Sequence, residues 1–473
     1  MSAEKLKKIL QPILIAGKEV LPIFEGGKGI GATNGLTAGS FAKENAVGTF
    51  SAVMPDLLDD NGDYIPLKFK TTTRREKHEE LIEYSIKACI SQAKRAFDIS
   101  GGMGKIHMNV LWEMGGAKRI LEGVLEKARG LVSGVTCGAG MPYALSDIAK
   151  KYETYYFPIV SSARAFKALW KRSYSKVSDL LGGVVYECPW KAGGHNGLSN
   201  AENPNEPQTP YERIVEIRAF LNEVGMHEVP IILAGGVWNV SEYESYLNNP
   251  DVGKIAFQFG TRPLFTQESP VSTEWKQRLF TIKEGDVYLN KFSPTGFYSS
   301  AVENTFIKDL KQRTSTEMQF SDEKTELFSN EFSYGVRNRK LFLTSDDFKK
   351  ANDLKSQGFA EIMKTPDGTI IFVTEEKKNQ ITQDQRDCIG CLSGCLFSNW
   401  SEHLEGNTTG RMPDPKSFCI SKTLEQSIHT SNIENNLMFA GYNAFRFQQD
   451  EWYQGGKFMP TIKQLIERIQ IGL

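Results

Sequence analysis

The sequence predicts an α/β protein, a (β/α)8 TIM barrel with an appended cysteine-rich C-terminal module. Three observations lead to this fold class. Short apolar runs alternate with amphipathic stretches of helical length between residues 20 and 261, glycines and polar residues follow nearly every run, and the alternation stops beyond Phe265. Parallel strands that are covered on both faces read as nearly continuous apolar runs, so these runs are expected to be buried strands.

Eight such runs fit the strand number of a closed barrel, and a doubly wound open sheet is the competing arrangement. The expected strands are residues 20–24, 48–53, 105–111, 130–136, 155–161, 183–188, 229–234 and 254–259. Helical periodicity is clearest in residues 74–97, 117–128, 163–172 and 210–224. The last of these opens with Thr209 as the N-cap and Pro210 as the first helical residue.

The residues that follow the strands favour the barrel over the open sheet. Glycine-containing or polar segments come after six of the runs, always at the C-terminal end. In a barrel those ends converge on one mouth, which is where the active sites of this fold lie. A tight turn explains any one of these glycines, but it explains the whole set less well.

Beyond the barrel, we divide the chain into three parts. Residues 1–319 form the barrel domain, and residues 320–431 form a polar accessory module that carries a cysteine cluster and a hairpin-like turn at 365–369. Residues 432–473 form a C-terminal segment whose amphipathic stretch, 461–469, is expected to pack back on the barrel as a helix.

Composition excludes several classes of function. Lys and Arg number 56 against 57 Asp and Glu, so no global positive field would gather nucleic acid or an anionic membrane. The uncharged stretch from Gly130 to Ser146 is broken by glycines and a proline, and the apolar run from Ile9 to Gly17 does not resemble a cleaved signal. We therefore expect a cytoplasmic protein with no nucleic-acid or membrane partner.

Two glycine sites follow the seventh and eighth expected strands, Gly235-Gly236 and Gly260-Thr261. In a barrel this pair of positions forms a phosphate cradle, in which backbone N–H groups and a helix N-terminus meet the ligand. Flavin mononucleotide (FMN) is the commonest ligand with that requirement. No G-x-G-x-x-G fingerprint for a dinucleotide opens a βαβ unit here.

His195 is the candidate catalytic residue. It lies between Gly193-Gly194 and Gly197 after the sixth strand, which gives its backbone freedom and its ring access to a substrate. An imidazole in such a place suits a general base. The alternative is a loop histidine that is hydrogen-bonded to the backbone.

Three segments together resemble the nitronate monooxygenase family: 192–197 (AGGHNG), 230–237 (PIILAGGV) and 258–262 (QFGTR). The segments 22–31 and 107–110 are similar to the first and third strand ends of that family. The resemblance covers residues 12 to 310. It implies an FMN-binding barrel with His195 as the base, and these residues at the cofactor: Gly26, Gly27, Asn109, Gly193, Gly194, Gly235, Gly236, Gly260 and Thr261.

Two lysines depart from the family pattern. Lys28 stands where many relatives carry methionine, and Lys191 stands where glutamate is common. Cations at these positions would stabilise a reduced flavin or an anionic substrate, or they lie as solvated residues on the rim.

Four of the seven cysteines are crowded near the C-terminal end, as Cys388, Cys391, Cys395 and Cys419. The C-x2-C-x3-C spacing brings three thiolates onto one loop, and four thiolates complement a [4Fe-4S] cluster. The segment is also similar to the cluster loop of 2,4-dienoyl-CoA reductases. Zinc is the rival metal, and reduced thiols without metal are the third possibility.

The expected function is oxidation of nitronates by dioxygen to a carbonyl compound and nitrite, with a small-molecule substrate. The alternative is a flavin reductase that takes electrons from NAD(P)H, or from an electron-transfer partner, and acts on an enoyl-acyl substrate. A [4Fe-4S] cluster favours this second reaction. A non-catalytic barrel scaffold is the alternative from a different class.

Overall fold

The computed structural model describes residues 10–335 and 337–473, so Ile9, the first residue of the apolar N-terminal run, lies outside it. Eight parallel strands close into a barrel in the order β10-β12-β13-β3-β4-β7-β8-β9. Each strand overlaps one of the eight predicted runs, which confirms the predicted fold class. The strands are β3 (Ile23–Glu25), β4 (Val47–Ser51), β7 (Lys105–Leu111), β8 (Gly134–Gly138), β9 (Tyr155–Val160), β10 (Val184–Glu187), β12 (Ile231–Ala234) and β13 (Ile255–Phe259).

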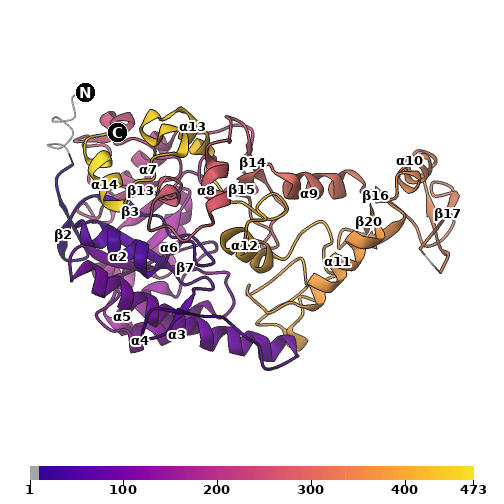
Figure 1. Cartoon of the computed structure of the whole chain (residues 1–473), viewed down its shortest axis with the longest axis horizontal. Helices are drawn as coiled ribbons and strands as arrows, with labels where there is room; N and C mark the ends of the chain where they lie inside the picture. The colour runs from indigo at the N-terminus through magenta and orange to yellow at the C-terminus, as the bar shows by residue number, and fades with distance from the viewer. Residues whose placement is uncertain (1–9, 336) are drawn as a thin grey trace.

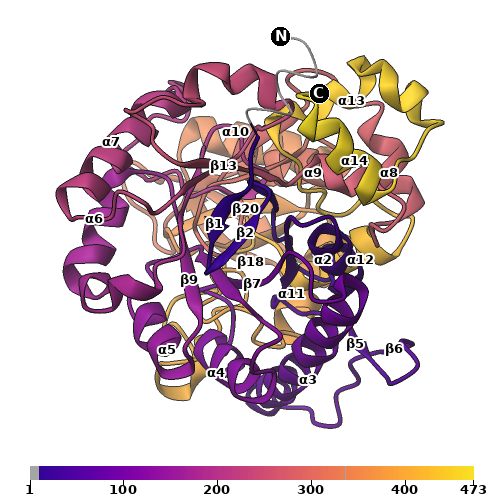
Figure 2. The same cartoon turned by 90° about the vertical axis from the view of Figure 1, so that its left-hand side faces the viewer.

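Helices surround the strands, as Figure 2 shows. Four of them were predicted: α3 (Arg74–Ser100), α4 (Ala117–Lys127), α6 (Ala163–Arg172) and α7 (Pro210–Glu223). Two were missed, α2 (Gly35–Lys43) and α5 (Leu145–Tyr152). Glycines obscure α2, because they let it press against α3, where a Cβ on Gly39 would lie 2.8 Å from the Ala96 carbonyl oxygen. The capping box of Asn34 and Thr37 was the usable signal for α2.

The barrel is completed by the C-terminal segment. Short 3-10 helices, η2 (Val240–Tyr246) and η3 (Arg262–Phe265), follow β12 and β13 in place of α-helices. The predicted C-terminal helix α14 (Ile462–Gln470) packs beside α2, and the Ser241 N–H donates to the Gly472 carbonyl (3.4 Å). Helix α14 therefore takes the place of the eighth barrel helix, and four of its apolar residues join the barrel core.

A hairpin lies at the N-terminal end of the barrel, opposite the mouth. It consists of β1 (Ile13–Ile15) and β2 (Lys18–Val20), and Figure 2 shows it in front of the strands. Ile15 and Val20 pack with barrel-interior side chains such as Phe24 and Phe157. This closes the lower end of the barrel and leaves the C-terminal mouth as the place for a site.

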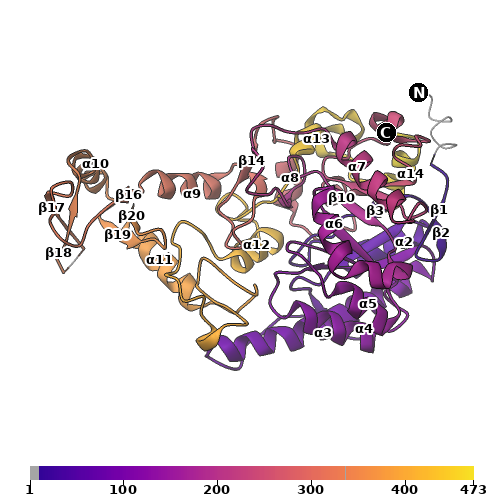
Figure 3. The ribbon, with the colours of Figure 1, turned by 180° about the vertical axis from the view of Figure 1, so that it is seen from behind.

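After the barrel, the chain runs outward and returns (Figures 1 and 3). Helix α8 (Thr273–Leu279) is followed by β14 (Val287–Asn290) and β15 (Ser299–Val302), which form a small sheet with β11 (Gly194–His195). Helix α9 (Thr305–Ser315) leads away to a distal lobe, and α11 (Glu375–Arg386) leads back. The cysteine segment and α12 (Ile420–His429) then cover the mouth. The short helix η4 (Glu405–Asn407) precedes α12. Three further short helices connect α12 to α14: η5 (Tyr442–Phe445), α13 (Arg446–Gln449) and η6 (Glu451–Gly456).

The predicted accessory module contains two different parts. The first is the distal lobe, residues 318–373, which has its own apolar core around Phe332, Leu343 and Phe372 and contains no cysteine. The lobe consists of β16 (Met318–Gln319), β17 (Asn330–Tyr334), β18 (Arg339–Leu343), α10 (Ser345–Ser356), β19 (Glu361–Lys364) and β20 (Thr369–Val373). The predicted turn at 365–369 joins β19 to β20 as an antiparallel hairpin. The second part is the cysteine segment, which lies against the barrel.

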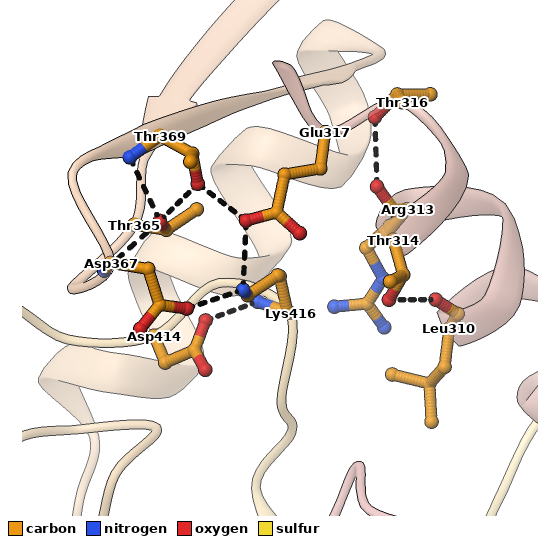
Figure 4. Close-up of polar contacts among 10 residues, drawn as sticks. All are labelled: Leu310, Arg313, Thr314, Thr316, Glu317, Thr365, Asp367, Thr369, Asp414 and Lys416. Atoms are coloured by element: carbon orange, nitrogen blue, oxygen red, sulfur yellow. Dashed lines mark hydrogen bonds and ion pairs between the residues drawn. The ribbon is translucent and has the colours of Figure 1, made fainter. Parts of the chain in front are cut away.

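Polar contacts fix the base of the distal lobe (Figure 4). Lys416 donates to Glu317 (2.9 Å) and to Asp367 (2.7 Å), and the Thr369 hydroxyl donates to Glu317. The Arg313 guanidinium of α9 donates to the Pro415 carbonyl (3.0 Å). The outgoing helix, the lobe hairpin and the returning segment therefore meet at one junction. No helix in the described ranges has the length and apolar character of a membrane span.

Candidate active site

One cavity occupies the C-terminal mouth of the barrel, and the residues predicted for catalysis and cofactor binding surround it. The structure brings all ten of them together in its lining: Gly26, Gly27, Asn109, Gly193, Gly194, His195, Gly235, Gly236, Gly260 and Thr261. The space not filled by atoms is about 1660 Å³ including its open mouth.

The predicted phosphate cradle has unoccupied backbone donors. Gly235 and Gly236 have φ of +81° and +83°, a conformation that side-chain-bearing residues rarely adopt. Within the described residues, the backbone N–H groups of Gly235, Gly236 and Gly260 donate to no other group of the chain. A Cβ on Gly260 would meet nothing within 4 Å, so this backbone faces open space. Free N–H donors on such a surface fit the phosphate of a flavin mononucleotide.

A second contributor to the cradle was missed by the sequence analysis. Residues 438–443, which we name the C-terminal strap, cross over the two glycine turns. The Asn443 side-chain amide donates to the Gly236 carbonyl (2.5 Å), and the Gly441 N–H donates to the Thr261 hydroxyl (3.3 Å). A Cβ on Gly193 would lie 2.5 Å from the Ala440 carbonyl carbon, so the strap packs directly against the loop that leads to His195.

Next to the Gly260 turn, the Gly26-Gly27 turn packs against Asn109. A Cβ on Gly27 would overlap the Asn109 side chain, so only glycine allows this approach. The Gly26 N–H donates to the Phe259 carbonyl (2.9 Å), which ties this turn to the strand that leads into Gly260. The three strand ends therefore form one continuous wall.

His195 lies on β11 and lines the cavity. Its Nε2 is 2.6 Å from the Ser293 hydroxyl, which is in turn 2.8 Å from the Thr295 hydroxyl. The Phe439 ring of the strap packs edge-on against the imidazole, with 5.7 Å between ring centroids. Burial lowers the pKa of His195 to about 4, so the imidazole is neutral at physiological pH. A neutral imidazole is able to accept a proton.

Two carboxyl groups at strand ends were not selected by sequence reasoning: Glu187, which lines the cavity, and Glu25, which is buried at the end of β3. Burial raises the pKa of Glu187, at the end of β10, to about 8, so this lining carboxyl is protonated at neutral pH. Burial also raises the pKa of Glu25 and lowers that of Lys28, although the Coulomb attraction between the two opposes both shifts. Lys28 donates to the Gly26 carbonyl (2.7 Å) and lines the cavity, as does Lys191. Their positions at strand ends were the only sequence signal for Glu25 and Glu187.

Comparison with known families identifies the family of the chain. The model of the nitronate monooxygenase family matches residues 104–372, which is more than half of the chain. The chain belongs to the nitronate monooxygenase family. Membership makes it a flavin-dependent oxidoreductase, rather than a non-catalytic scaffold, and implies FMN as the flavin.

Solved structures of three proteins resemble this nitronate monooxygenase family member at low sequence identity. FabK from Thermotoga maritima is 17% identical, with 66% of this chain and 78% of that chain covered and a TM-score of 0.43. Nitroalkane oxidase from Streptomyces ansochromogenes is 14% identical, with 64% and 81% covered and a TM-score of 0.44. The enoyl reductase domain of MlnA from Bacillus amyloliquefaciens is 13% identical, with 95% and 92% covered and a TM-score of 0.47. No curated protein matches the chain in sequence.

The cysteine loop lies outside the residues matched by the nitronate monooxygenase model, yet it is fastened to the barrel mouth. The Gly115 N–H donates to the Cys391 carbonyl (2.9 Å), and the Ser393 N–H donates to the Glu113 carbonyl (2.8 Å). Buried His78 of α3 has its Nδ1 2.9 Å from the Gly390 carbonyl oxygen. The loop is therefore a fixed wall of the site, and Cys391 lines the flavin cavity.

The four predicted metal ligands gather without forming a site for a single ion. Cys388, Cys391, Cys395 and Cys419 are free thiols, and the other three lie close enough to Cys391 to add to the raised pKa that its burial causes. Among residues 10–335 and 337–473, no three His, Cys, Asp or Glu side chains are placed to hold a metal ion. Neither zinc nor an iron-sulfur cluster has support from this geometry, and both stay predictions.

Proposed function

We propose that this protein oxidises alkyl nitronates with dioxygen to a carbonyl compound and nitrite. The supporting observation is the neutral imidazole of His195 in a cavity that also contains Lys28 and Lys191. A nitroalkane has an acidic α-proton, and its conjugate base is an anion. A base and cations in one pocket suit that pair of species.

The residues of the chain have separable roles. FMN, when bound, supplies the acceptor for electrons from the substrate. Gly235, Gly236, Gly260 and Thr261 hold its phosphate through backbone N–H groups. The tautomer in which His195 Nε2 donates to Ser293 leaves the lone pair of Nδ1 for the α-proton of the substrate. Lys28 and Lys191 balance the negative charge that remains on the substrate.

An anaerobic mixing experiment tests this proposal. Flavin-loaded protein is mixed with propyl-2-nitronate in one anaerobic experiment and with NADH or NADPH in a second. Flavin absorbance is followed in both. We expect the nitronate to bleach the flavin and, when air is admitted, nitrite and acetone to form in equal amounts. Rapid bleaching by NAD(P)H with none by the nitronate would reject nitronate oxidation.

The cysteine loop favours a second candidate, the NAD(P)H-dependent reduction of an enoyl-acyl substrate. A one-electron relay has a use when electrons enter from outside, and little use when the substrate supplies them. The C-x2-C-x3-C spacing, the fourth thiol at Cys419 and the position of Cys391 on the cavity wall support a [4Fe-4S] cluster as that relay. In this reaction His195 orients or protonates the acyl substrate.

Metal analysis of protein prepared without oxygen tests the cluster. Iron and acid-labile sulfide should each approach about four per chain, and Cys391→Ser should lower both together. Cys89→Ser is the matched control, because Cys89 is buried in α3 outside the cysteine loop, and it should leave both contents unchanged. Zinc without sulfide, or no metal at all, would reject the cluster.

A further inference from the structure

One face of α12 forms a wall of the flavin cavity. Ile420, Leu424 and Ile428 recur at every fourth position, so they lie on one stripe of the helix, and all three line the cavity. Eight residues of α-helix rise about 12 Å. The stripe therefore presents an apolar surface of about that length to the site.

Other parts of the cavity lining are also apolar. Met54 from the segment after β4, Leu264 of η3 and Trp275 of α8 line the same cavity. They belong to the apolar cluster that includes Leu424 and Ile428. Apolar side chains that pack on one another and also line a cavity mark a place where a ligand's apolar part is covered.

Helix α12 is held at both ends, so this wall is part of the fold. At its C-terminal end, the Ser272 N–H donates to the Ile428 carbonyl (2.9 Å), and His429 Nε2 lies 3.8 Å from Asp56 Oδ1. At its N-terminal end, the helix begins directly after Cys419, beside the cysteine loop that is fastened to the barrel.

Charged and apolar lining residues come from different parts of the molecule. Lys28, Glu187 and Lys191 come from the strand ends of the barrel, whereas the apolar stripe comes from α12. A ligand that satisfies both surfaces has a polar reacting group at the barrel and an unbranched apolar chain along the helix.

We infer that the substrate carries a medium-length alkyl chain, of roughly eight to ten carbons, which lies along the α12 stripe. An extended chain advances about 1.25 Å per carbon with C–C bonds of about 1.52 Å and angles near 111°, so a wall of about 12 Å covers that number. This inference rests on the proposed function for the position of the reacting group at the flavin.

Binding of n-alkanoates to the flavin-loaded protein tests the inference without turnover. A carboxylate presents the same planar, two-oxygen anion as a nitronate, and perturbation of the flavin spectrum reports its binding. From butanoate to dodecanoate, Kd should fall about fourfold per added methylene, the ratio expected for burial of a CH2 group, and then level off near ten carbons.

Substitutions on α12 test where the alkyl chain of the ligand lies. Leu424→Trp fills the space beside the stripe, so Kd should stop falling at a shorter alkanoate than in the parent. Butanoate binding and flavin content should stay at the parent values. Glu425→Trp is the control, because Glu425 is exposed on the same helix, and it should reproduce the parent series. Ile428→Phe provides a second filling variant if Leu424→Trp fails to retain flavin.

The outcomes separate the two proposals. A Kd that does not change with chain length, or an unchanged series in both filling variants, would overturn the alkyl-chain site even if nitronates bleach the flavin. A steep series in a protein that nitronates do not reduce would keep the alkyl-chain site and reject nitronate oxidation.

Discussion

His195 illustrates how much of the site is decided by single side chains. Its glycine neighbours in the sequence indicated a reactive histidine, but its pKa depends on groups far along the chain. Ser293 is 98 residues away, and Phe439 comes from the C-terminal strap. The spacing of residues predicts that a histidine is placed at the mouth, whereas its hydrogen-bond partner and its burial depend on tertiary packing.

Replacing His195 should abolish proton abstraction and leave the cofactor in place. With a neutral nitroalkane as substrate, we expect His195→Gln to lower kcat/KM by about 10² to 10⁴, the usual contribution of a general base. Flavin content, measured by absorbance, should match the parent. A kcat/KM within threefold of the parent would show that the ring has only a structural role.

The acid limb of the pH profile should lie near 4. The base must be unprotonated, and burial lowers the pKa of His195 to about 4, so kcat/KM for a neutral nitroalkane should fall only as pH drops through that value. A limb at the ordinary histidine value of about 6.5 would contradict the burial argument. The measurement is kcat/KM from pH 3.5 to 7 with enzyme stability checked at each point.

Glu187 should weaken the binding of anions above pH 8. Its carboxyl is neutral below a pKa of about 8 and negative above it, so Kd for butanoate should rise by roughly tenfold between pH 7 and 9. Loss of the Lys28 proton acts in the same direction. Glu187→Gln should therefore show a smaller rise than the parent, and an equal rise would exclude a role for Glu187.

At the scale of elements, the C-terminal strap is the part of the site that the sequence did not reveal. The three signature segments carry recognisable glycines, and they were placed at the cavity because each directly follows a strand. Residues 438–443 follow no strand and show no periodicity, and their place at the cavity comes from crossing the turns at Gly236 and Thr261. Helix α2 was missed for a related reason, because its glycines allow close packing against α3 and obscure the helical pattern in the sequence.

Removing the strap contact should loosen the cofactor. Asn443→Ala deletes the hydrogen bond to the Gly236 carbonyl, and the expected cost of about 0.5–1.5 kcal/mol raises the Kd for FMN by roughly two- to tenfold. Flavin fluorescence on titration of the flavin-free protein measures this. Asn435→Ala, at an exposed position before the strap, should leave the Kd unchanged. Equal values for both variants would remove the strap from the cradle.

At the scale of the whole molecule, the barrel was predictable because each of its eight buried strands appears in the sequence as an apolar run. The alternation of these runs with helical stretches stays recognisable where single elements are irregular. The division of the chain beyond residue 319 into a distal lobe and a cysteine segment was less evident from the sequence. The distal lobe and the cysteine segment are both polar in sequence, but the lobe packs its own core, whereas the cysteine segment returns to the mouth. Which of two polar segments returns to the barrel depends on tertiary contacts such as the Gly115–Cys391 hydrogen bond.

The distal lobe should be dispensable for the barrel. The Phe372 N–H donates to the Thr316 hydroxyl (3.0 Å), so the two ends of the lobe are adjacent and a short glycine-serine linker can replace residues 318–372. The deletion removes two ion pairs with residues outside the lobe. The pair of Lys416 with the exposed Asp367 contributes little, whereas the pair of Lys378 with Glu361 involves a largely buried carboxylate. We expect flavin content and butanoate binding to match the parent. A flavin-free or aggregated product would show that the lobe supports the barrel.

The position of the strap along the chain has a consequence for biosynthesis. The last barrel strand ends at Phe259, but the cradle is closed by Gly441 and Asn443. A ribosome that adds about 5–20 residues per second needs roughly 10 to 35 s more to reach the strap. During that interval the nascent barrel carries the glycine turns without their strap, so this part of the site is completed only late in translation.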